Sequence, residues 1–96
     1  MEATSKNRYI EAVGRRKTAI ARVRITPATK TSFVINDKTV EEYFTTLELQ
    51  TLAQEALFKS EVSEKFLVSV HVVGGGIHAQ AEAVRHGLAR TLVLRD

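Results

Sequence analysis

The residues best suited to binding an anion are three consecutive glycines, Gly74, Gly75 and Gly76. They follow a strand-like apolar run, Phe66 to Val73, and precede a stretch with helical spacing of apolar residues. Glycine adopts positive φ readily and lets a phosphate or another backbone approach closely. The first turn of the following helix would also point unpaired N–H groups at the glycines. This corner is a candidate anion site, and a tight turn without a ligand explains the same residues equally well.

A second candidate for phosphate binding lies near the N-terminus. Gly14, Arg15, Arg16 and Lys17 predict a turn with three consecutive cations, between strands at 8–13 and 18–26. In the second strand, arginines alternate with small and branched residues that we expect to be buried. Arg22 and Arg24 should therefore project from one exposed face that adjoins the basic turn. A cationic hairpin of this kind is suited to contacting phosphates.

Charge is segregated along the 96 residues, although the net charge is only +3. Residues 1–30 hold eight basic and two acidic residues, whereas residues 31–65 hold three basic and seven acidic residues. This pattern favours one face for a polyanion and another for solvent or a protein neighbour. An ordinary solvated surface is the alternative interpretation.

Other chemistry finds little support in the sequence. His78 and His86 are eight residues apart, which is about 12 Å along a helix and too far for one metal ion. The chain has no cysteine, which excludes disulfides and thiolate zinc sites. No G-x-S-x-G motif is present, and no G-K-[ST] follows the glycines. We therefore expect no catalytic residue, no metal and no cofactor.

The chain also lacks membrane and export signals. No apolar run approaches the roughly 18–20 residues of a membrane span, and residues 1–6 lack the apolar centre of a signal peptide. We expect a soluble protein of the cytoplasm or an organelle matrix, with a loose lead at 1–7 and one globular domain at 8–96.

Periodicity predicts strands at 8–13, 18–26, 31–35 and 66–73, with an Asn36-Asp37 turn after the third strand. Capping boxes at Thr39–Glu42 and Thr45–Glu48 predict a short helical turn and a longer helix over 46–58. The element order favours an α+β fold, a two-layer sandwich with a four-stranded mixed sheet and helices on one face.

The helix after the glycines has an apolar stripe that we expect to face the core, made of Ile77, Ala81, Val84, Leu88 and Leu92. The opposite side is a candidate RNA-contacting face or a merely solvated one, and consists of Ala79, Ala83, His86 and Arg90. Glu82 carries a negative charge, which argues against phosphate contact on its part of the helix.

Three parts of the sequence together resemble a known family. They are Gly14 to Val23, the Ile35-Asn36-Asp37 turn followed by Tyr43-Phe44, and the block from Gly74 to Arg90. They resemble protein nine of the small ribosomal subunit, in its bacterial or organellar form. The resemblance runs from about Tyr9 to Leu94, with the G-R-R-K turn and the G-G-G-x-x-A-Q block in the family's order and separation.

The resemblance implies a non-enzymatic structural protein of the ribosomal head, bound to small-subunit ribosomal RNA and neighbouring head proteins. It also implies a left-handed β-α-β crossover, against the general right-handed rule. The family's RNA-facing positions correspond here to Gly14, Arg15, Arg16, Lys17, Arg22, Gly74, Gly75, Gly76, Gln80, Arg85, His86 and Arg90. We add Arg24 from the exposed strand face.

One departure from the family concerns the C-terminus. The family continues into a long basic tail that reaches the peptidyl-site tRNA, whereas this chain ends at Arg95-Asp96. The missing tail argues against direct contact between this chain and that tRNA.

Two other classes of function remain open. One is a small phosphate- or nucleotide-binding enzyme that uses the Gly74–Gly76 corner, which fold analogy alone favours. The other is a protein-interaction module that uses the acidic helix over 46–58, the part of the chain that we expect to avoid nucleic acid.

Overall fold

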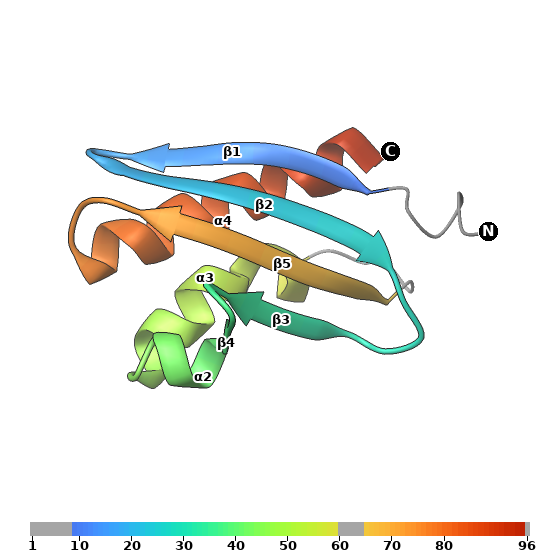
Figure 1. The fold of residues 1–96 in the computed structure, drawn as a ribbon, viewed down its shortest axis with the longest axis horizontal. Coiled ribbons are helices and arrows are strands. Elements are labelled where there is room, and N and C mark those ends of the chain that lie inside the picture. Colours follow the sequence, from blue (N-terminus) through green and yellow to red (C-terminus); the bar gives the residue numbers. More distant parts are fainter. Residues whose placement is uncertain (1–8, 60–64, 96) are drawn as a thin grey trace.

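The chain folds into a five-stranded mixed sheet with helices packed against it (Figure 1). The computed structural model describes residues 9–59 and 65–95, so the expected lead at 1–7 and the connection at 60–64 lie outside the described residues. The elements are β1 (Ile10–Arg16), β2 (Ala19–Pro27), β3 (Ser32–Ile35), β4 (Lys38–Thr39), α2 (Val40–Tyr43), α3 (Leu47–Lys59), β5 (Phe66–Val73) and α4 (Ile77–Arg95).

The strand order is β1-β2-β5-β3-β4, in which β3 and β5 are parallel and the other neighbours are antiparallel. The predicted α+β class is confirmed. The predicted count of four strands is one short, because β4 has only two residues and cannot show an alternating pattern.

The central strands have one buried and one exposed face. Buried and exposed residues alternate along the whole of β5 and along most of β2. In β2, Ala21 and Val23 are buried, whereas Arg22 and Arg24 are exposed on the opposite face, as predicted. The face without helices is called the open face below.

The first hairpin differs from the prediction. β1 continues to Arg16, which pairs with Ala19, so that the hairpin tip is only Lys17 and Thr18. The sequence G-R-R-K resembles a turn, but Gly14 lies within the ladder opposite Ala21. Lys17 adopts a φ of 56°, a left-handed conformation that is uncommon for a residue with a β-carbon.

Local capping explains the ends of the short elements. Thr39 and Glu42 form the predicted capping box at the start of α2. The cap of α3 lies one residue later than expected, because the Thr46 hydroxyl accepts from the Leu49 N–H at 3.2 Å. Asn36 and Asp37 form the predicted turn between β3 and β4, both with positive φ, as a two-residue type I′ hairpin requires.

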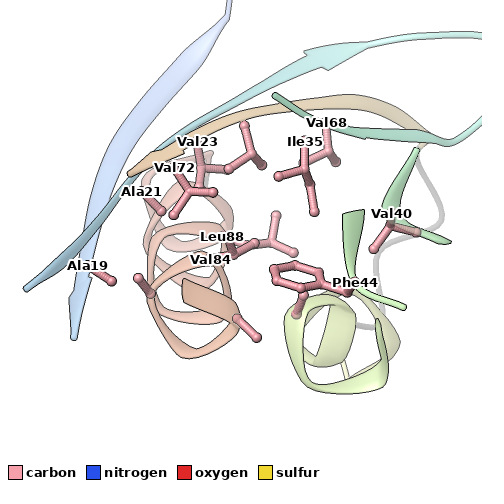
Figure 2. Close-up of a cluster of buried hydrophobic side chains, with 14 of the residues drawn as sticks. Ala19, Ala21, Val23, Ile35, Val40, Phe44, Val68, Val72, Val84 and Leu88 are labelled. Atoms are coloured by element: carbon pink, nitrogen blue, oxygen red, sulfur yellow. The ribbon is translucent and has the colours of Figure 1, made fainter. Parts of the chain in front are cut away.

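The core fills the space between the sheet and the helices (Figure 2). Phe44, Val84 and Leu88 meet side chains of β2, β3 and β5 there and are fully buried. Two predictions for α4 are wrong. Ile77 is 47% exposed, because it begins the helix at the end of the sheet, and Ala83 is fully buried, because α4 packs beneath β1 as well as β2.

Candidate nucleic-acid interface

The hairpin tip and the glycine corner lie at the same end of the molecule (Figure 1). Ile20 pairs with Val73 in the sheet, which brings the two turns side by side. Gly74 has a φ of 82°, and a β-carbon there would lie 2.4 Å from the Thr18 carbonyl oxygen. Packing against the hairpin tip therefore accounts for glycine at position 74.

The other two corner glycines differ from each other. Gly75 also has a positive φ, 68°, and a β-carbon there would lie 3.1 Å from that of Ala19. A β-carbon on Gly76 would meet no atom within 4 Å, and its φ is not positive. The fold therefore does not require glycine at 76, where the backbone is open to an approaching molecule.

The Gln80 side chain connects the glycine corner to α2. Its Nε2 donates to the Gly74 carbonyl at 3.0 Å, and its Oε1 accepts from the Tyr43 hydroxyl at 2.7 Å. The resemblance places Gln80 among the RNA-facing residues, whereas both ends of its amide have protein partners here. Its geometry is that of a residue that holds the corner against α2.

A groove lies beside the corner, between the end of β1 and helices α3 and α4. It has a volume of about 570 Å³ and is lined by Arg15, Arg16, Glu55, Ala56, Glu82, Arg85, His86 and Ala89. We call it the basic groove, because it brings together three of the predicted arginines. Its wall includes α3, so the acidic helix that we expected to avoid nucleic acid in fact adjoins the basic surface.

Two ion pairs cross the basic groove. Arg16 Nε donates to Glu82 Oε1 at 2.8 Å, and Arg85 Nη1 lies 3.0 Å from Glu55 Oε1. The hydrogen bond from Arg16 lowers the pKa of the Glu82 carboxyl below its ordinary value. Glu82 therefore lies within the cationic cluster rather than beside it.

Four residues predicted to face RNA lie in the contact between α4 and β1. A β-carbon on Gly14 would lie 2.0 Å from the Ala83 carbonyl oxygen. Arg90 Nη1 donates to the Val13 carbonyl at 2.7 Å, and the Arg15 N–H donates to His86 Nδ1 at 3.4 Å. Because β1 is an edge strand, these contacts satisfy backbone groups that no neighbouring strand can pair.

Sequence reasoning missed Gly87 as a contributor to this contact. A β-carbon there would lie 2.8 Å from a methyl carbon of Val23 and 3.0 Å from the Gly14 nitrogen. The available signal was a glycine inside a helical pattern, which indicates a close approach of two backbones.

Arg22 and Arg24 lie outside the basic groove. Both lie on the open face, where their Nε atoms contact Glu11 at 3.2 and 2.8 Å, and Arg24 also stacks 4.5 Å from the centre of the Tyr9 ring. The hydrogen bond to Glu11, with Tyr9 nearby, raises the pKa of Arg24 above its ordinary value. They line a separate hollow of about 220 Å³. Arg15 pairs with Ile20, two residues from Arg22 along β2, and therefore lies on the same face of the sheet as Arg22 and Arg24, so the surface that they share with the basic turn stays a prediction.

Within the described ranges, no three side chains of the metal-binding types gather in one place. None of the helices described here is long and apolar enough to span a membrane.

The sequence matches the family described as Ribosomal protein S9/S16 over residues 14–96. The chain belongs to this family. The matched part begins at Gly14 and includes the hairpin tip, the corner and the basic groove, whereas Tyr9 and Glu11 precede it.

Two relatives in the family are named small ribosomal subunit protein uS9. The protein of Lawsonia intracellularis (strain PHE/MN1-00) is 43% identical over 82 residues, which cover 85% of this chain and 62% of the relative. The protein of Desulfovibrio desulfuricans (strain ATCC 27774 / DSM 6949 / MB) is 45% identical over 83 residues, which cover 86% of this chain and 63% of the relative. The match thus spans somewhat less than two thirds of each relative's length.

Proposed function

We propose that this chain is a structural component of the small ribosomal subunit and that it binds ribosomal RNA through one end of the fold. The observation that carries the proposal is the family match, which includes every residue of the basic groove. The names of the two relatives supply the ribosomal context. The binding surface consists of the hairpin tip, the corner and the basic groove.

The mechanism is electrostatic positioning without chemistry. Arg15, Arg16 and Lys17 project from a two-stranded hairpin, and each can neutralise a phosphate and release a counterion. The open backbone at Gly76 allows a ribose-phosphate chain to approach the first turn of α4, whose N–H groups favour an anion. Such a surface reads RNA shape and backbone spacing more than base identity.

The finer parts of the proposal follow from the family. The chain would lie in the head of the subunit, beside other head proteins, in the cytoplasm or an organelle matrix. It would act without catalysis or cofactor. The connection from β3 through α2 and α3 to β5 would have the left-handed crossover that the resemblance implies.

The test is binding of the 96-residue chain to a transcript of the small-subunit head RNA across a salt series, with an unrelated structured RNA for comparison. We expect preferential binding to the head transcript and a steep loss of affinity with salt, about 0.7–0.9 log units per log unit of salt for each phosphate neutralised. Absence of binding to the head transcript at low salt would refute the proposal.

A further inference from the structure

Glu82 is an acidic residue at the centre of a surface that otherwise suits a polyanion. Its side chain is 23% exposed, less than Glu11 at 29% and Glu55 at 34%, the other carboxylates in ion pairs described here. It lies in the second turn of α4, so a rigid helix fixes its position. Its place in the basic groove differs from the free, solvated position expected of a surface glutamate.

Two basic side chains from different elements converge on the same carboxylate oxygen. Arg16 Nε of β1 donates to Oε1 at 2.8 Å, and His78 Nδ1 of α4 lies 3.8 Å from that atom. Within the described residues, no acceptor is bonded to the terminal Nη atoms of Arg16. The carboxylate therefore fixes the guanidinium while leaving its outer edge available to a phosphate, which is the geometry of an oriented arginine.

The same carboxylate opposes binding. A phosphate that reaches Arg16 must also come within a few ångströms of Glu82, because the two side chains are in contact. That repulsion acts on any polyanion, whereas the gain from the oriented guanidinium requires a phosphate in the right place. Glu55 is the second acid of the groove, and it contacts Arg85. Its negative charge also repels a polyanion, so it adds to the selectivity of the groove.

We propose that Glu82 determines the RNA specificity of this surface, by orienting Arg16 and by weakening the binding of RNA whose phosphates do not match. The inference rests on the proposed function. It assigns to Glu82 a positioning and selecting part in RNA binding, in contrast to the simple avoidance of phosphate that its charge alone predicts.

Two substitutions at this position separate charge from position. Glu82→Gln keeps an oxygen that can accept from Arg16 but removes the charge. Glu82→Asp keeps the charge but shortens the side chain, which breaks the 2.8 Å contact with Arg16. Glu41→Gln, on exposed α2, removes the same charge away from the groove and is the matched control.

Each variant is titrated against the head transcript and the unrelated structured RNA, after thermal unfolding has shown that it is folded. We expect Glu82→Gln to bind the unrelated RNA about threefold to tenfold more tightly, the effect of one charge at close range in water. We expect Glu82→Asp to bind the unrelated RNA as the wild type does and the head transcript more weakly. Both variants then discriminate less, while Glu41→Gln stays within about twofold of the wild type.

The titration of the wild type tests the proposed function, and the titrations of the Glu82 variants test the inference about Glu82. If the wild type prefers the head transcript but Glu82→Gln binds the unrelated RNA no more tightly, the selecting part is wrong. If Glu82→Asp binds the head transcript as the wild type does, the positioning part is wrong. If the wild type binds both RNAs equally, it has no specificity for Glu82 to determine and the inference alone is wrong, whereas absence of binding to the head transcript refutes the proposed function.

Discussion

At the scale of single residues, the glycines have different tasks that the sequence does not distinguish. Gly14 and Gly87 allow β1 and α4 to touch through their backbones, and Gly74 allows the corner to contact the hairpin tip. Gly76 has no such neighbour. Substitution by alanine should therefore separate the glycines that serve the fold from the one that is available for binding.

We predict that Gly14→Ala destabilises the fold by about 2–4 kcal/mol, because the added methyl group overlaps backbone atoms of Ala83 and Gly87 that cannot move independently. Gly76→Ala should cost about 1 kcal/mol or less, the usual loss at a helix N-cap. Urea denaturation of both variants measures the difference. Equal losses of stability would contradict the packing role of Gly14.

The ion pair between Arg16 and Glu82 should make stability depend on pH. The hydrogen bond from Arg16 lowers the pKa of Glu82 from its ordinary value of 4.5, so the carboxylate stabilises the folded state above that pH. This contribution is lost as the pH falls through the lowered folded pKa. The urea midpoints of the wild type and Glu82→Gln should therefore differ near pH 7 and converge as the pH falls below 4.5 and through the lowered folded pKa.

An Arg16→Ala background controls for this effect. Without the arginine, the Glu82→Gln substitution should leave the pH dependence almost unchanged. A difference between Arg16→Ala and the double variant as large as that seen with Arg16 present would assign the effect to another partner of Glu82.

At the scale of elements, polar side chains attach α4 to the rest of the fold along its length. Gln80 holds its first turns to the corner and to α2, while His86 and Arg90 hold its later turns to the edge of β1. Asn36 extends the first attachment, because its Nδ2 donates to the Val72 carbonyl and lies 3.4 Å from the Tyr43 hydroxyl. The corner is thus tied to the β3–β4 turn through three side chains, those of Gln80, Tyr43 and Asn36.

We predict that Tyr43→Phe and Gln80→Ala each lower the stability by about 0.5–2 kcal/mol, because each breaks a partly buried hydrogen bond. The double variant should lose less than the sum of the two, since the side chains share one bond. Thermal unfolding measures all three variants. If Gln80→Ala leaves stability unchanged but weakens RNA binding, Gln80 is an RNA contact rather than a support of the corner.

The features of the fold that the sequence predicted correctly are those that follow from periodicity, capping and turn residues. The alternation in β2 and β5, the capping box at Thr39 and the Asn36-Asp37 turn all depend on neighbours in the chain, and all are confirmed. The need for glycine at position 14 inside β1 and the burial of Ala83 depend on a contact between segments about seventy residues apart. Local pattern carries no information about such a contact.

The candidate site shows the same limit. The basic turn and the later arginines were identified by residue type, but their partners Glu82 and Glu55 could be assigned only from the folded arrangement. His86 and Arg90 have backbone partners on β1 that no spacing rule would predict. Residue type therefore identifies cations, and tertiary structure decides which of them serve the fold.

At the scale of the whole molecule, the predicted cations divide between two surfaces. Arg16 and Arg85 line the basic groove on the helix side of the molecule, whereas Arg15 borders the groove but lies on the open face of the sheet, paired with Ile20. Arg22 and Arg24 line the hollow on the open face, where Glu11 contacts both of them. An RNA segment bound at the groove therefore gains little from the second pair unless the RNA also covers the open face.

The salt dependence of binding can assign RNA to these surfaces. We predict that replacing Arg15, Arg16 and Lys17 together by alanine lowers both the affinity for the head transcript and the salt slope, by about 0.7–0.9 for each phosphate contact removed. Replacing Arg22 and Arg24 by alanine should change the slope by less than half as much, because Glu11 already neutralises part of their charge. The measurement is a filter-binding or fluorescence titration of both variants at four or more salt concentrations. An equal change in slope for the two variants would show that RNA covers the open face as well, and the molecule would then bind RNA on two sides rather than at one end.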